Sequence, residues 1–194
     1  MKGVYIFLAD GFEETEALAP YDMLVRAGVP VKTVCLNDDN FVTSSHRVPM
    51  LAELNFGEFL HVVETEGTSA EDVMIFPGGM PGSSNLAANE VLMKLMNAHY
   101  AEGGAVAAIC AAPALVLASK MKEGTLAGKE MTCYAGMEAP IPAAGASYRK
   151  TGVITDGRVI TASGAGHAVA FGLEIVAYLK DRQTADKIAA AIML

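Results

Sequence analysis

The chain of 194 residues has no tryptophan, few cysteines and a deficit of basic side chains. Its 14 Lys and Arg face 22 Asp and Glu, so the formal net charge is −8. An acidic chain without a Lys/Arg cluster is a poor ligand for nucleic acid or an anionic membrane. No apolar run approaches the roughly 20 residues that a transmembrane helix needs. We therefore expect neither a nucleic-acid nor a membrane partner.

The sequence also lacks the patterns of an exported or metal-binding protein. The first apolar run is short and leads into the acidic segment Asp10–Glu14 rather than a small-residue cleavage site. This favours a cytoplasmic location, where Cys35, Cys110 and Cys133 would stay reduced. No Cys/His spacing resembles a zinc site. We therefore expect no metal.

What the chain does contain is enough apolar sequence for a large core. Hydrophobic residues make up 52% and charged residues 19%, which is typical of a globular chain. No linker or internal repeat divides the sequence, so residues 1–194 are predicted to form one domain.

Strand-like and helix-like segments alternate along the chain. Strands are predicted at 3–9, 29–36, 73–76 and in the apolar run before Cys110, and helices at 13–27, 89–102, 165–179 and 184–192. Hairpins are predicted for 41–43 with 47–51, and for 153–154 with 158–162. The first helix should be kinked or broken near Pro20, and residues 52–72 give no clear pattern. The alternation predicts an α/β fold, with a mostly parallel sheet between two helical layers.

Cys110 lies where an apolar strand turns into an Ala- and Leu-rich segment. Small residues flank it at Ala108 and Ala112, as in a nucleophile elbow. The following helix N-terminus would then stabilise a thiolate and lower the cysteine pKa. The alternative is a small core residue, which is the commoner role of a buried cysteine.

Two further segments follow strands and should reach the same edge of the sheet. In the first, Glu13 and Glu14 suit a helix start electrostatically, whereas Glu16 could point inward. A protonated Glu16 would donate a hydrogen bond to a thiolate, and an ionised one would raise the thiol pKa. In the second, Pro77–Gly82, glycine amides could form an oxyanion pocket, although a plain turn is the alternative.

These motifs together resemble the ThiJ/PfpI superfamily, and more closely the branch of the parkinsonism-associated protein deglycase. The resemblance rests on the segments 10–16, 76–79, 107–113 and 164–166. It implies a flavodoxin-like sandwich that works as a homodimer without a cofactor. It further implies that Cys110 is the reactive cysteine, that Glu16 is its protonated partner, and that the amides of Gly79 and Ala111 line an oxyanion or sulfinate pocket. Arg26 and Arg47 match basic positions near the family's dimer interface.

The chain departs from the family pattern at several positions. Ala111 stands where protease-like members carry histidine, which argues against a protease. Cys133 and Tyr134 lie near the position of a histidine in glyoxalase-type members. His167 could replace that histidine or simply pack at a helix start. Cys133 could resolve an oxidised Cys110 or be a pocket-wall thiol.

Two functions therefore remain open. One is a glyoxalase- or deglycase-type lyase or hydrolase, in which Cys110 attacks a small reactive carbonyl compound. The other is a redox-sensing or protective protein, in which peroxide oxidises Cys110 to the sulfinic acid without turnover.

Overall fold

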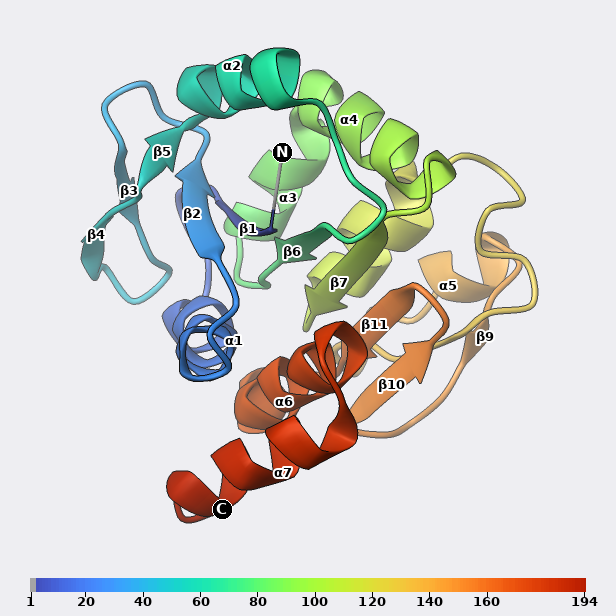
Figure 1. Cartoon of the computed structure of the whole chain (residues 1–194). Coiled ribbons are helices and arrows are strands. Elements are labelled where there is room, and N and C mark those ends of the chain that lie inside the picture. The colour runs from blue at the N-terminus through green and yellow to red at the C-terminus, as the bar shows by residue number, and fades with distance from the viewer. Residues whose placement is uncertain (1–2) are drawn as a thin grey trace.

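The computed structural model describes residues 3–194, and a seven-stranded sheet forms the centre of this part of the chain (Figure 1). From edge to edge the strands are β10 (Val153–Asp156), β11 (Val159–Ala162), β7 (Ala105–Ile109), β6 (Val73–Phe76), β1 (Val4–Leu8), β2 (Val31–Cys35) and β5 (Leu54–Asn55). All neighbours are parallel except β10 and β11, which form an antiparallel hairpin. Two small sheets accompany it, β3 (Phe41–Thr43) with β4 (Pro49–Leu51), and β8 (Glu130–Met131) with β9 (Ser147–Tyr148).

Helices cover both faces of this sheet (Figure 1). One face carries α1 (Glu14–Arg26), the 3-10 turn η2 (Ala165–His167), α6 (Ala168–Leu179) and α7 (Arg182–Ala191). The other carries α2 (Phe56–Glu66), α3 (Gly82–Ala88), α4 (Glu90–Ala101), the π-helix η1 (Pro113–Ala118) and α5 (Pro140–Ala143).

Strand β1 shows how the two cores arise. Tyr5 and Phe7 belong to the same apolar cluster as Phe59 of α2, whereas Ile6 and Leu8 belong to the cluster on the opposite face. Successive side chains of a strand point to opposite faces, so a strand that is buried on both sides reads as a continuous apolar run. The predicted fold class, a mostly parallel flavodoxin-like sheet between helices, is confirmed.

Helix α1 runs unbroken through Pro20, which contradicts the break that was one of the two predicted forms. The proline lies where α1 packs against α6, and a Cβ at Gly172 would fall 2.7 Å from the Pro20 Cα. The expected break is therefore wrong. Tertiary packing against α6 holds the helix together where the local propensity favours a break.

The hairpin of β3 and β4 is confirmed, with Phe41 opposite Leu51. Its second strand begins at Pro49 rather than at Arg47. The intervening turn is closed by the Ser44 amide, which donates to the Val48 carbonyl, and Arg47 has a positive φ of 65°. A residue in this left-handed conformation cannot continue a strand.

The unassigned region 52–72 contains β5 and α2. Asn55 and Glu58 form a reciprocal capping box at the start of α2. This Asn-x-x-Glu spacing is a helix start signal that is legible in the sequence. Within residues 3–194, no helix is both long and apolar enough to cross a membrane.

Candidate active site

Three loops meet at the carboxyl edge of the sheet, where β7, β6 and β1 are neighbours. The loop after β1 contacts the loop after β6 directly, since the Glu13 amide donates to the Gly78 carbonyl over 3.0 Å. A Cβ at Gly79 would fall 2.5 Å from the Gly11 carbonyl oxygen, so a side chain there would displace backbone. A glycine at position 79 is thus required by the close approach of the backbones of these two loops.

Cys110 is the first residue beyond β7 and adopts a left-handed conformation, with a φ of 63°. Such a φ is strained in a residue with a side chain, and it persists only where the surroundings enforce it. Here the Cys110 amide donates to Ala162 over 2.9 Å and its carbonyl accepts from Tyr134 over 2.8 Å. The side chain is half-buried. This geometry agrees with the strained strand-to-helix turn of a nucleophile elbow.

Glu16 lies in the first turn of α1 and is 1% exposed. Its carboxyl group accepts a hydrogen bond from the Gly78 amide over 2.9 Å and is also hydrogen-bonded to the Cys110 thiol. The Ala165 amide of η2 is a further partner. The carboxyl group therefore joins four separate segments of the chain, and its position is fixed.

The other two glutamates of this segment have different partners. Glu13 caps α1, because its Oε2 accepts from the Glu16 amide over 2.7 Å. Glu14 pairs with His46 of the β3–β4 turn at 2.9 Å. Of the three, Glu16 is the one that reaches the cysteine.

Burial raises the pKa of Glu16 to about 7, and the charge of Glu13 adds to the shift. The hydrogen bonds with Cys110, Gly78 and Ala165 lower this pKa in part. A carboxyl group with a pKa near neutrality can hold a proton or release one at physiological pH, as acid–base catalysis requires.

The pKa of Cys110 shifts in the direction opposite to the one expected from the helix N-terminus. Burial is the largest cause and the Glu16 carboxylate is the second, and the pKa of Cys110 is raised to about 12. The following helix is six residues of π-helix that begin with Pro113, which has no N–H to offer. The expectation of a lowered pKa is thus wrong, because burial raises the pKa most and an ionised Glu16 adds to the shift. When Glu16 is protonated, its repulsion is absent and it can donate to the sulfur.

Two backbone amides also act on the Cys110 thiol. The N–H groups of Gly79 and Ala111 hydrogen-bond it and lower its pKa, partly offsetting burial. The structure thus brings together the four residues Cys110, Glu16, Gly79 and Ala111. That these amides stabilise an oxyanion or a sulfinate stays a prediction.

His167 and Cys133 have hydrogen-bond partners outside this group of four residues. His167 is exposed, its Nδ1 is 3.0 Å from Ser163 Oγ, and its ring lies against Gly152. Cys133 is buried, and its thiol donates to the Tyr134 carbonyl over 3.4 Å. Burial raises the pKa of Cys133 to about 11. Among residues 3–194 all three cysteines are free thiols.

The two arginines from the family pattern lie on the surface. Arg26 pairs with Asp22 over 2.8 Å, and Arg47 is exposed in the β3–β4 turn. Neither contacts the cysteine in the described part of the chain. The structure also adds a group that the sequence analysis did not assign, the Ala165 amide on Glu16. The sequence feature that indicates this amide is the run of small residues after β11, because β11 is the strand next to β7 in the sheet.

The chain is similar to known proteins over nearly its whole length. The model of the DJ-1/PfpI family matches residues 2–178. Protein dj-1beta of Drosophila melanogaster is 31% identical over 193 residues, covering 100% of this chain and 97% of the fly protein. The glutathione-independent glyoxalase DJ-1 of Schizosaccharomyces pombe is 27% identical, covering 91% and 90%. The structure of oxidized Toxoplasma gondii DJ-1 superposes with a TM-score of 0.86 at 30% identity, covering 98% of this chain and 97% of that one.

Proposed function

Because this chain belongs to the DJ-1/PfpI family, we propose that it is a cysteine-dependent, cofactor-independent stress-response protein that acts on small reactive carbonyl compounds. The observation that carries the proposal is the hydrogen-bonded pair of Glu16 and Cys110 beside two amides, those of Gly79 and Ala111. A relative that bears the name glyoxalase supports this choice of substrate class.

The proposed reaction begins when the Cys110 sulfur attacks the aldehyde carbon of a 2-oxoaldehyde such as methylglyoxal. A carbon–sulfur bond forms as the carbonyl π bond breaks, and the negative charge moves to oxygen. The amides of Gly79 and Ala111, which already hydrogen-bond the thiol, stabilise this oxyanion. The thiol proton passes through Glu16 to the oxygen, which gives a hemithioacetal.

Isomerisation and hydrolysis complete the cycle. Glu16 removes the proton from the former aldehyde carbon and returns it to the neighbouring carbon, while the hydroxyl proton of the hemithioacetal passes to the neighbouring ketone oxygen, so that a 2-hydroxy thioester forms. Water then hydrolyses the thioester to the 2-hydroxy acid and frees the Cys110 thiol. The oxidation of one carbon balances the reduction of the other, so no cofactor is consumed. The pKa of Glu16 of about 7 suits a group that gives and takes a proton.

The test is the turnover of methylglyoxal to lactate by the parent chain and by Cys110→Ser. We expect the serine variant to lose activity by on the order of 10³-fold, because an alcohol is a far weaker nucleophile than a thiolate. Cys35→Ala is the matched control, since Cys35 is fully buried, its thiol donates to the Asn37 carbonyl over 3.4 Å, and it should not affect turnover. Equal turnover by the parent chain and Cys110→Ser would refute the proposal.

A redox-sensing or protective function is the second candidate. Its support is the absence of a histidine partner on the Cys110 thiol among the described residues, where Glu16, Gly79 and Ala111 are the groups that act on it. Hydrogen peroxide would transfer one oxygen to the sulfur and leave as water, giving the sulfenic acid, and a second peroxide would give the sulfinic acid. Glu16 and the two amides would hold the oxidised group.

Limiting peroxide separates the two candidates. A sensor should oxidise at Cys110 before the buried Cys35 and Cys133, and should lack methylglyoxal turnover. Prior oxidation of either buried cysteine would remove the basis for a sensor. We also propose that the chain forms a homodimer and is located in the cytoplasm. Sedimentation of the purified chain would test whether it is a dimer.

A further inference from the structure

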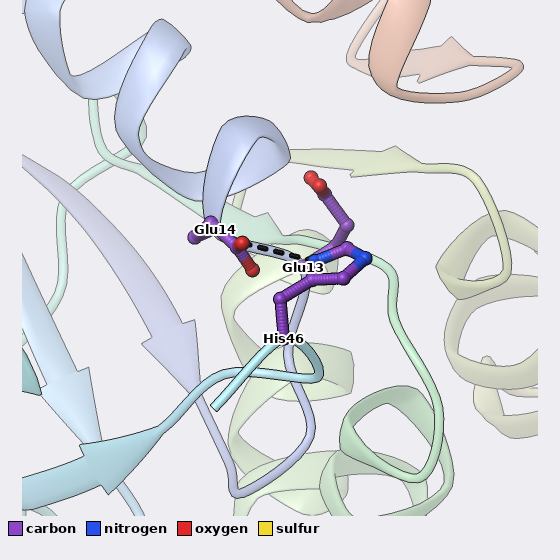
Figure 2. Close-up of side chains that lie close together, drawn as sticks. All are labelled: Glu13, Glu14 and His46. Atoms are coloured by element: carbon purple, nitrogen blue, oxygen red, sulfur yellow. Dashed lines mark hydrogen bonds and ion pairs between the residues drawn. The ribbon is translucent and has the colours of Figure 1, made fainter. Parts of the chain in front are cut away.

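Glu13, Glu14 and His46 form a cluster of potential metal ligands that the proposed reaction does not use (Figure 2). One donor atom from each residue lies within 4.8 Å of the others. The cluster joins the start of α1 to the turn between β3 and β4, which are 32 positions apart at Glu14 and His46. A search of local sequence spacing could not find it, because the ligands come from separate segments.

The backbone beneath the cluster is fixed. The Ser45 amide donates to the Phe12 carbonyl over 2.7 Å, and Phe12 and Ser44 form an isolated bridge. The Gly11 amide donates to Thr43 over 2.8 Å. The turn that carries His46 is therefore tied to the residues that immediately precede Glu13, so the three side chains start from fixed positions and order little backbone on binding an ion.

The donor atoms of the cluster are incompletely satisfied. The Glu14 carboxylate pairs with His46 through Oε1 at 2.9 Å and is also hydrogen-bonded to the Ser44 side chain, whereas its buried Oε2 has no partner of normal geometry among the described residues. Glu13 uses Oε2 to cap α1, which leaves its other oxygen available. The His46 side chain is 67% exposed and can turn. No lysine or arginine within residues 3–194 forms a salt bridge with Glu13 or Glu14.

We propose that Glu13, Glu14 and His46 bind a divalent transition-metal ion such as Zn²⁺, with water in the remaining position. Zinc–nitrogen and zinc–oxygen bonds of about 2.0–2.2 Å place the donors of a tetrahedral site roughly 3.3 Å apart. The observed separations, from 2.9 Å to at most 4.8 Å, bracket that value. Side-chain rotation alone can bring the three donors to a shared ion.

The donor set also selects the class of ion. One imidazole with two carboxylates suits zinc, copper or nickel, whereas calcium and magnesium prefer a shell of oxygens. The positive end of α1 opposes any cation, so we expect weaker binding than at a buried structural zinc site. Neither Cys110 nor Glu16 is a ligand, although Glu13 lies close enough to Glu16 for its charge to act on that group.

Isothermal titration with Zn²⁺ tests the proposal on the full chain with Cys110→Ser, which removes the half-buried thiol as a competing ligand. We expect one ion per chain, and at least a tenfold loss of affinity in both His46→Ala and Glu14→Gln. His61→Ala is the matched control, because His61 is another exposed histidine, lies on α2 and should leave affinity unchanged. An excess of Mg²⁺ should not displace the ion.

Co²⁺ provides a second readout that does not depend on a substitution. In the parent chain the bound ion should show a d–d spectrum without a thiolate charge-transfer band, since its ligands are nitrogen and oxygen. A thiolate band, or unchanged zinc affinity in His46→Ala, would overturn the proposal. Tenfold weaker binding in His61→Ala would overturn it as well.

Discussion

Both ends of the sheet bury a carboxyl group, and they use it differently. At the amino edge, Asp72 is 2% exposed, and its oxygens accept from the amides of Gly3 and Ser69 over 2.7 Å and 2.9 Å. At the carboxyl edge, Glu16 is equally buried, but one of its partners is the titratable thiol of Cys110. A carboxyl group bonded to amides is a structural acceptor, whereas one bonded to a thiol can exchange a proton.

The residues near Asp72 and near Glu16 also differ. Near Asp72, Arg158 donates to the carbonyls of Tyr100 and Gly104 over 2.6 Å each and lies 4.0 Å from the Tyr100 ring centre. Near Glu16, Cys110 has a strained backbone. The carboxyl edge therefore combines backbone strain with a titratable partner, whereas Asp72 is held by backbone amides.

Neutral isosteres at the two carboxyl groups should separate these roles most strongly. Glu16→Gln still offers an oxygen to the Gly78 amide but cannot transfer a proton, so methylglyoxal turnover should fall by roughly 10²-fold or more. Asp72→Asn should leave turnover unchanged and lower the free energy of unfolding by about 1–3 kcal/mol, because an amide NH₂ then faces a backbone N–H. Steady-state kinetics and urea unfolding of both variants measure this. The reverse pattern would show that the roles are misassigned.

The pH dependence of stability should carry the signature of Glu16. In the unfolded chain this group loses its proton near the ordinary glutamate pKa of 4.5, whereas in the folded chain it keeps it to about 7. Between these values the folded state binds more protons, so the free energy of unfolding falls as pH rises. Relative to Glu16→Gln, the parent chain should lose about 3 kcal/mol between pH 4 and pH 8. Parallel pH profiles of the two chains would contradict the raised pKa.

Substituting alanine for Gly104 at the amino edge or for Gly78 at the carboxyl edge should perturb packing in both cases. Activity should change only for Gly78. A Cβ at Gly104 would overlap the buried ring of His99, and a Cβ at Gly78 would lie 2.5 Å from the Cys110 Cβ. Each substitution should lower the free energy of unfolding by about 1–3 kcal/mol. Only Gly78→Ala should also reduce turnover. Loss of turnover in the Gly104→Ala chain, measured under conditions in which it is fully folded, would contradict the assignment of activity to the carboxyl edge alone.

The smallest effect is expected at Arg158. Arg158→Lys keeps the charge but loses the planar group that bonds two carbonyls and stacks on Tyr100. The free energy of unfolding should fall by about 1 kcal/mol, with turnover unaffected. Thermal unfolding would measure the change, and a stability equal to that of the parent chain would mean that these contacts contribute little.

The sequence predicted the fold well because the central strands are buried on both faces and read as unbroken apolar runs, as in Val4–Leu8 and Ala105–Ile109. It failed where tertiary contacts override local signals. Pro20 stays within α1 because that helix packs on α6. The location of Cys110 at a strained turn followed from its small neighbours, and a raised thiol pKa was one of the two outcomes considered for Glu16. That burial is the largest cause of the raised pKa could not be predicted, since burial depends on contacts between distant segments.

The proton shared between Glu16 and Cys110 is the central claim, and the pH dependence of alkylation tests it most directly. Peptide mass spectrometry after iodoacetamide treatment would follow each cysteine in the parent chain and in Glu16→Gln. Since ionised Glu16 raises the pKa of Cys110, Cys110 of the variant should react faster above pH 7, and the inflection near pH 7 from Glu16 should vanish, while Cys133 stays unchanged. Identical Cys110 profiles in the two chains would contradict the account.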